Sequence, residues 1–252
     1  MAIRRRELGL PEGWRAALKR VPGARPLVLW LRRTFHPHHR ALRQIERDRP
    51  GQLLQPEPTT GRSRYPEIFE FVACDLATIE CPRVLSWGCS SGLELLALRE
   101  ALPRAALIGV DINPRSLAKA AEVTSGMADV ELRLSGNPDD FAGEIFDAVF
   151  CMAVMRHAHL EQRPDSCADV LPFGQAEAFA SGLGRLVRPG GLLALWYVHF
   201  RLQDMVVGAQ FSPVLELEKG VWANDPLYGP DDRRMDGATS MVAVYRRRVP
   251  AD

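Results

Sequence analysis

The residues best suited to chemistry lie in a glycine-containing stretch, VLSWGCSSGLE at 84–94. Its small residues, Gly88, Ser90 and Gly92, let a backbone approach a ligand closely, and the helix start that follows offers unpaired amide groups. Leu93 occupies the third small position of the G-x-G-x-x-G pattern, which argues against a dinucleotide site. No G-x-x-x-x-G-K-[ST] motif is present, so the sequence also argues against a P-loop nucleotide triphosphatase.

An acidic residue follows at a meaningful distance. The apolar run ALIGV at 106–110 ends in Asp111, which is 23 residues after Gly88 (111 − 88). A carboxylate at the end of a second strand can accept hydrogen bonds from both hydroxyls of a ribose that lies across the first turn. The pair therefore predicts a ligand that contains a nucleoside.

The elements that must position these residues follow a regular order. Short apolar runs alternate with segments of helical spacing, and this pattern is typical of a parallel sheet covered on both faces. Asn113 and Pro114 form a helix start, with the asparagine as N-cap. Strands are predicted at 83–87, 106–110, 130–134, 146–152 and 191–198, and helices at 93–102, 114–123 and 175–187. We predict a doubly wound α/β sheet, mostly parallel, in which PVLELE and SMVAVYRRR near the C-terminus add antiparallel pairing.

The charge distribution divides the chain. Residues 1–64 carry 15 Lys and Arg against 5 Asp and Glu (15 − 5 = +10), and residues 65–252 carry 17 against 26 (17 − 26 = −9). We therefore expect a basic, partly helical cap or arm at 1–64 and a ligand-binding domain at 65–252. No apolar run is long enough to span a membrane, and no secretory signal precedes the domain, so a cytoplasmic protein is expected.

Four motifs in order resemble the class I S-adenosylmethionine-dependent methyltransferases. They are VLSWGCSSG, GVDINP, FDAVFCMAV and RLVRPGGLL, and the likeness covers roughly residues 60–200. It implies a Rossmann-like methyltransferase sheet and S-adenosyl-L-methionine as cofactor. Ser86 stands where the family often has an acid and Ser90 where it often has glycine. With Glu94, these two residues look most like the chemotaxis-receptor methyltransferase branch.

The resemblance also implies roles for particular residues. The turn with Gly88, Cys89, Ser90 and Gly92 would lie under the methionine part of the cofactor, and Asp111 would hold the ribose. Ile112 would flank the adenine, and Asn137, with Asp139 as the alternative, would bind its amino group. Cys151 and Met152 would line the cofactor and face the acceptor. Arg64 or Arg62 would pair with the cofactor carboxylate, unless this stretch is only a solvated linker.

Catalysis by methyl transfer depends chiefly on alignment and exclusion of water, so a base is optional. His157 and His199 follow the fourth and fifth predicted strands, at places expected to open onto the ligand crevice. Either can remove a proton from a hydroxyl or ammonium acceptor. No metal site is expected, because the five cysteines lack C-x-x-C spacing and His36, His38 and His39 lack an i, i+4 pair.

The acceptor class is less constrained. We expect a small-molecule acceptor, methylated on oxygen or nitrogen. One alternative is an RNA methyltransferase whose basic segment binds phosphates, although CMAV stands where an N-P-P-[YF] motif would be. Another is a non-catalytic protein that binds the cofactor or a partner. Peripheral membrane contact through PLVLWLRRTF at 26–35 would suit a lipid-like acceptor.

Overall fold

The computed structural model describes residues 37–56, 65–218 and 223–250. Its α-helices are α3 (Pro37–Asp48), α4 (Pro66–Asp75), α5 (Leu93–Ala101), α6 (Pro114–Val123) and α7 (Phe173–Leu186). Its strands are β1 (Arg83–Trp87), β2 (Ala106–Asp111), β3 (Val130–Leu134), β4 (Phe146–Met152), β5 (Val187–Trp196), β6 (Phe211–Glu216) and β7 (Val242–Arg247). Short 3-10 helices lie at η1 (Pro138–Phe141), η2 (Leu160–Gln162), η3 (Leu202–Asp204) and η4 (Val206–Gln210).

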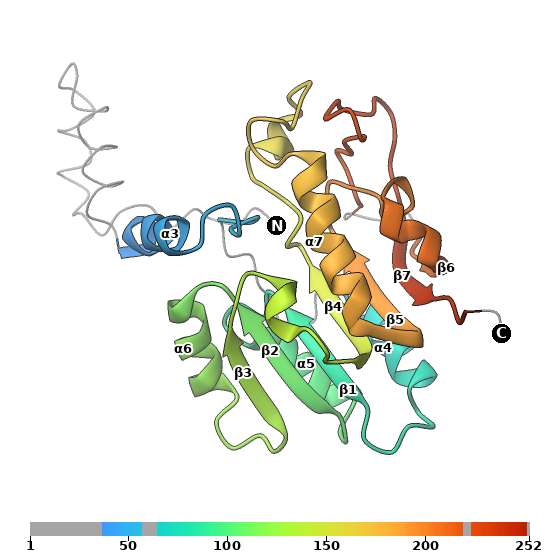
Figure 1. The fold of residues 1–252 in the computed structure, drawn as a ribbon. Helices are drawn as coiled ribbons and strands as arrows, with labels where there is room; N and C mark the ends of the chain where they lie inside the picture. Colours follow the sequence, from blue (N-terminus) through green and yellow to red (C-terminus); the bar gives the residue numbers. More distant parts are fainter. Residues whose placement is uncertain (1–36, 57–64, 219–222, 251–252) are drawn as a thin grey trace.

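The strands form one seven-stranded sheet in the order β3-β2-β1-β4-β5-β7-β6 (Figure 1). Strands β1 to β5 pair in parallel, whereas β7 is antiparallel to both β5 and β6. The chain runs outward from β1 to β3 and returns to place β4 on the other side of β1. The order therefore reverses at β1, and a crevice is expected beyond the carboxyl ends there. The predicted doubly wound, mostly parallel α/β sheet with antiparallel C-terminal pairing is confirmed.

Helices cover both faces of the sheet. One buried cluster joins Leu85 and Trp87 of β1 to the inner side of α7, including Phe179. A second cluster joins Val84 of the same strand to residues of α4, α5 and α6, such as Leu95 of α5. Because successive strand residues point to opposite faces, both faces of β1 are apolar and buried. The turn after β1 is thus fixed from two sides.

Local signals account for most boundaries. The Asn113 side chain accepts a hydrogen bond from the Arg115 N–H at 3.0 Å, with Pro114 in the first turn, as predicted for the start of α6. Strand β5 begins at Val187, four residues earlier than expected, because V-R-P-G-G is extended beside β4 through a register shift between Phe146 and Ala148. Helix α4, which the sequence analysis did not predict, begins with Pro66 and buries Ile68, Phe69 and Val72.

The N-terminal region is described only in part. Its HRALRQIERD segment lies in α3, which buries Ile45 and exposes Arg40, Arg43 and Arg47. The PLVLWLRRTF segment, His36, Arg62 and Arg64 lie outside the described residues. No helix in the described part of the chain is long and apolar enough to cross a membrane. Within the same residues, no group of three or more His, Cys, Asp or Glu side chains could hold a metal ion.

Candidate functional site

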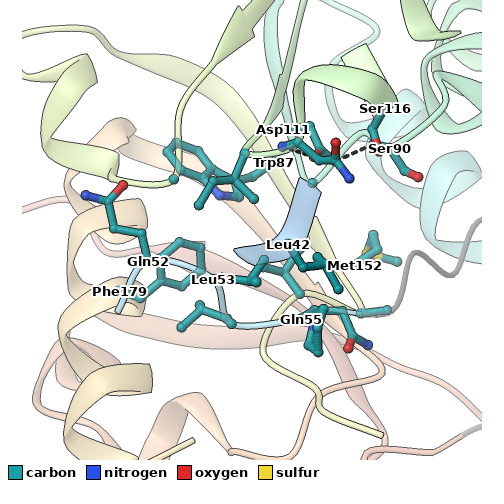
Figure 2. Close-up of a pocket in the computed structure, with 18 residues that line it drawn as sticks. Leu42, Gln52, Leu53, Gln55, Trp87, Ser90, Asp111, Ser116, Met152 and Phe179 are labelled. Atoms are coloured by element: carbon teal, nitrogen blue, oxygen red, sulfur yellow. Dashed lines mark hydrogen bonds between the residues drawn. The ribbon is translucent and has the colours of Figure 1, made fainter. Parts of the chain in front are cut away.

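A cavity lies at the carboxyl ends of β1, β2 and β4, where the strand order reverses (Figure 2). Five residues predicted from the sequence line it: Gly88, Ser90, Asp111, Ile112 and Met152. The structure therefore brings together residues from the turn after β1, the end of β2 and the end of β4.

The turn after β1 depends on two glycines. Gly88 has φ +79°, and a Cβ there would lie 2.5 Å from Val154 Cγ2, so only glycine lets the residues after β4 pack against the turn. Gly92 has φ +83°, and its Cβ would lie 3.0 Å from the Ala120 Cα of α6. The Gly88 N–H donates to the Val110 carbonyl at 2.7 Å, which ties the turn to β2. The turn is thus rigidly placed between two strands and a helix.

The Asp111 carboxylate is held by backbone groups. One oxygen accepts from the Ser90 N–H at 2.9 Å and the other from the Asn113 N–H at 2.7 Å. Burial raises the pKa of Asp111, although these two N–H groups counteract the shift. Each carboxylate oxygen retains acceptor capacity after one bond. The residue can therefore present two acceptor positions to a pair of hydroxyls in the cavity.

Among the described residues, the other predicted cofactor residues do not line this cavity. Gly92 lies behind the turn, and the Cys89 and Cys151 side chains are buried in the two cores, where burial raises the pKa of both thiols. The Asn137 side chain accepts from the Asp139 N–H at 3.1 Å and so caps η1, while Asp139 pairs with Arg185 at 2.5 Å. The side chains of this loop are used in local contacts.

One wall of the cavity comes from a segment that the sequence analysis placed in the cap without naming its residues. We call residues 49–56 the strap; Gln52, Leu53, Leu54, Gln55 and Pro56 of the strap line the cavity, together with Leu42 of α3. The strap is anchored by Leu54, which is buried in the core that contains Trp87, and by the Gly51 carbonyl, which accepts from Gln175 Nε2 at 2.5 Å. The apolar pair Leu53-Leu54 was the only signal for it.

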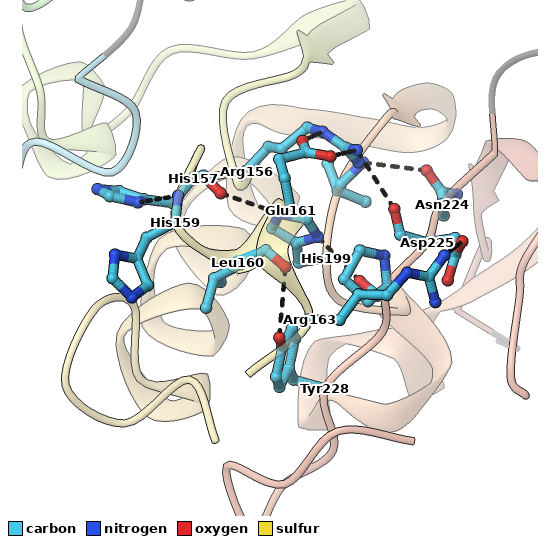
Figure 3. Close-up of polar contacts among 12 residues, drawn as sticks. Arg156, His157, His159, Leu160, Glu161, Arg163, His199, Asn224, Asp225 and Tyr228 are labelled. Atoms are coloured by element: carbon cyan, nitrogen blue, oxygen red, sulfur yellow. Dashed lines mark hydrogen bonds and ion pairs between the residues drawn. The ribbon is translucent and has the colours of Figure 1, made fainter. Parts of the chain in front are cut away.

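The two candidate bases lie beyond β4 and β5, in the region drawn in Figure 3. His157 is half-buried and does not line the cavity; its Nδ1 accepts a hydrogen bond from the His159 N–H at 3.1 Å. His199 is fully buried, with Nδ1 2.8 Å from the Pro226 carbonyl and Nε2 3.4 Å from the His157 carbonyl. Burial, with Arg156 nearby, lowers the pKa of His199 to about 3. The expected opening of His199 onto the crevice is not observed.

Arg156 links the segments of this region. Its guanidinium lies 3.5 Å from the centre of the Tyr197 ring, donates to Glu161 at 2.7 Å and donates to the Asp225 carbonyl at 3.2 Å. The side chain is 4% exposed. Arg163 forms a second ion pair with the Asp225 carboxylate (Figure 3). These contacts hold the loops after β4 and β5 against residues 223–228.

Comparison with known proteins shows what one part of the chain is similar to. Residues 84–191, which run from β1 into β5 and contain the turn and Asp111, match the family model described as a methyltransferase domain. Residues 84–191 are therefore similar to S-adenosylmethionine-dependent methyltransferase domains. S-adenosyl-L-methionine is the cofactor of such a domain.

Several solved structures are similar to this chain. PKMT2 from Rickettsia typhi is 22% identical, with 56% of this chain and 26% of that chain covered and a TM-score of 0.42. The plantazolicin methyltransferase BpumL, solved with SAH, is 14% identical, with 65% and 54% covered and a TM-score of 0.39. The N-methyltransferase NodS from Bradyrhizobium japonicum WM9 is 14% identical, with 73% and 96% covered and a TM-score of 0.47. The chain thus spans a quarter to a half of the first two. No curated protein sequence matches this chain.

The polar groups that line the cavity fit the nucleoside part of this cofactor. Asp111 is the one charged side chain among the described residues that line the cavity, and its acceptor positions suit a ribose diol. With the strap in place, the cavity holds about 80 Å³. Pockets for small organic ligands usually hold about 300–1,000 Å³. The cavity is thus smaller than a usual pocket for a ligand of this size.

Proposed function

We propose that the protein is an S-adenosylmethionine-dependent methyltransferase that acts on a small-molecule acceptor, at an oxygen or a nitrogen atom. The observation that carries this proposal is Asp111, whose two carboxylate oxygens are held by the Ser90 and Asn113 N–H groups at the edge of the cavity. Such a fixed carboxylate beside a glycine turn is suited to a ribose with a substituent that extends over the turn.

The chain's own residues would act mainly by positioning. The backbone of Gly88 and Ser90 would hold the methionine part of the cofactor, and Asp111 would hold the ribose. Met152 would line the cavity below the bound acceptor. When bound, the cofactor supplies a methyl group on a positively charged sulfur; the bond from carbon to the acceptor forms as the bond to sulfur breaks, leaving a thioether. Alignment of acceptor and methyl is the main contribution that the protein makes to such a displacement.

We propose His157 as the group that takes the acceptor proton. It lies five residues after the end of β4, on the side where Val154 lines the cavity, and it is half-buried. Because Nδ1 accepts from the His159 N–H, the neutral ring carries its proton on Nε2. The hydrogen bond from the His159 N–H must therefore open before Nδ1 can accept a proton from the acceptor. If the acceptor is already anionic, alignment alone suffices.

We further propose that residues 1–64 form a basic cap or arm on a domain that spans 65–252. The contribution of Leu42 and the strap to the cavity wall supports the cap. With this arrangement, the N-terminal region would close the site against water after the ligands bind.

A second candidate function, an RNA methyltransferase, is favoured by one observation. A surface groove is lined by Arg40, Arg43 and Arg47 of α3 and by Arg115 at the start of α6. Guanidinium groups in such a groove suit phosphodiesters. If RNA binds there, its affinity should fall steeply between 50 and 200 mM salt, as measured by filter binding; a flat, weak response would argue against this function.

The main test combines binding and transfer. By calorimetry, wild-type protein should bind S-adenosylhomocysteine. Asp111→Ala should weaken that binding by about 1.5–3 kcal/mol, because a charge-assisted pair of hydrogen bonds is lost. Incubation with S-adenosylmethionine tritiated on the methyl group, together with a cell ultrafiltrate or purified RNA, then separates the acceptors. Tritium in the low-mass fraction supports the first proposal, tritium in RNA supports the second, and cofactor binding without transfer to either contradicts both.

A further inference from the structure

The half-buried side chain of Gln52 differs from those of Gln44 and Gln175 in its hydrogen bonding. It is half-buried in the strap and lines the cavity, and its amide makes no hydrogen bond to any residue of 37–56, 65–218 or 223–250. By contrast, Gln44 donates to Asp48 at 2.8 Å and Gln175 donates to the Gly51 carbonyl. The amide of Gln52 is therefore available to a ligand in the cavity.

The position of Gln52 depends on a neighbouring glycine, Gly136, which has no side chain. A Cβ at Gly136, two residues after β3, would lie 3.0 Å from both Cβ and Oε1 of Gln52 and 2.4 Å from Ile112 Cδ1. Gly136 thus makes room for Gln52 and Ile112 to approach each other. Both residues lie beyond the end of β2, on the side of Asp111 that faces β3, whereas the glycine turn lies on the side of β1.

This placement matters because the cofactor has a fixed order of parts. If Asp111 holds the ribose and the methionine part extends over Gly88 and Ser90, the nucleobase must extend in the opposite direction. That direction leads to Ile112 and Gln52 in the cavity wall. A carboxamide offers one acceptor and one donor, which match the amino group and an adjacent ring nitrogen of adenine.

Three competing polar side chains at this end, those of Ser135, Asn137 and Asp139, make local contacts and do not line the cavity. The Asn137 oxygen caps η1, Asp139 pairs with Arg185, and the Ser135 hydroxyl donates to Asp140 at 2.6 Å. The loop after β3 therefore offers fewer side-chain groups for base recognition than its sequence suggests. The strap offers an amide in their place.

We propose that Gln52 determines the specificity of this site for the nucleobase, by hydrogen bonding to the amino-bearing edge of adenine. The proposal rests on the proposed cofactor function of the cavity. It assigns recognition of the base to a residue that lies outside the matched segment 84–191. Because Gln52 belongs to the strap, recognition of the base would depend on the placement of the strap beside the cavity.

A thermodynamic cycle between ligand and protein tests the proposal. Calorimetry would give the dissociation constants of S-adenosylhomocysteine and of its 6-deamino analogue, which lacks the amino group, for wild type, Gln52→Ala and Gln52→Leu. In wild type, loss of the amino group should weaken binding about 3- to 10-fold, the range for one neutral hydrogen bond. In both variants the two ligands should bind equally. The leucine variant keeps most of the side-chain volume and so controls for loss of packing.

Gln44→Ala provides the matched control, since Gln44 is an exposed glutamine of α3 that does not line this cavity. It should retain the wild-type preference between the two ligands. An equal penalty for the deamino analogue in wild type and in both Gln52 variants would overturn the inference and leave the proposed function intact. Failure of the wild type to bind S-adenosylhomocysteine at all would overturn the proposed function, and the inference with it.

Discussion

Two regions at the carboxyl edge of the sheet use their polar groups differently. On the cofactor side, meaning the cavity around Gly88, Asp111 and Gln52, the Gln52 amide and the remaining acceptor positions of the Asp111 carboxylate are available to a ligand. On the acceptor side, meaning the loops after β4 and β5 and residues 223–236, polar side chains are bonded to one another or to backbone. Examples are Arg156 with Glu161 and the buried Tyr228, whose hydroxyl donates to the Pro164 carbonyl at 3.0 Å.

Because of this difference, we expect the first region to determine ligand affinity and the second to contribute to the stability of the fold. On the cofactor side, removal of the Gln52 amide should change ligand affinity with little effect on folding, because that amide makes no hydrogen bond to any described residue. Substitutions on the acceptor side should lower the free energy of unfolding, since each leaves a buried partner without its hydrogen bond. Three experiments test this contrast, and the first concerns the proposed exception on the acceptor side.

The largest effect is expected at His157. If this half-buried ring takes the acceptor proton, His157→Ala and His157→Gln should lower turnover by roughly 10²–10⁴-fold while cofactor affinity stays nearly constant. The measurement is single-turnover transfer of tritium to the low-mass fraction, with calorimetry for affinity. The exposed neighbour His159 provides the control, as His159→Ala should keep wild-type turnover. Near-wild-type rates in the His157 variants would leave an alignment-only transferase.

A smaller effect is expected from the buried ring of His199. Its pKa is lowered to about 3 in the folded protein, whereas an unfolded histidine titrates near 6.5. Below pH 6.5 the unfolded state therefore binds a proton that the folded state does not, and stability falls as pH falls. Between pH 7 and pH 5 this should cost about 2 kcal/mol. Urea unfolding of His199→Asn should show a correspondingly shallower pH dependence than wild type.

His159→Ala serves as the control for that experiment too, because His159 is exposed. Its unfolding free energy should follow the wild-type pH dependence. If His199→Asn retained the full wild-type slope, the ring would not be held neutral by burial, and the acceptor side would be more open than the structure indicates.

The smallest effect is expected at Tyr228. Tyr228→Phe removes the hydroxyl that donates to the Pro164 carbonyl, and should lower the free energy of unfolding by about 1–2 kcal/mol. Affinity for S-adenosylhomocysteine should not change. Gln52→Ala should give the reverse result, with weaker binding and nearly unchanged urea unfolding, because the Gln52 amide makes no hydrogen bond to any described residue. Equal losses of stability in the two variants would remove the contrast between the two regions.

Local patterns explain why the cofactor side could be predicted from sequence. The glycine turn, the acid after the second strand and the N-cap Asn113 each act within a few residues, and all three are found where expected. The strap was different, because Leu53 and Leu54 are too short a run to show periodicity. Leu54 is buried in a core whose other members, such as Trp87, are distant in sequence.

The acceptor side was harder to predict for the same reason. The sequence places His199 directly after an apolar strand, where an outward-facing ring is plausible. Its actual direction is set by the Pro226 carbonyl and by the loop that contains His157, both of which reach it through the fold. Likewise, Asn137 has the residue type expected for base recognition, but its side chain caps the helix that begins next to it. A residue type at a given position does not specify which of its possible partners it takes.

The position of β7 has a consequence for synthesis of the chain. This strand is made last but lies inside the sheet, between β5 and β6. Until the ribosome has made residues 242–247, the apolar edge of β5 at Leu192–Ala194 has no strand beside it. At the usual rate of translation, about 5–20 residues per second, that edge of β5 stays unpaired for several seconds. An open apolar edge of this kind invites pairing between nascent chains, so yield of the folded protein should depend on chaperones that shield it during translation.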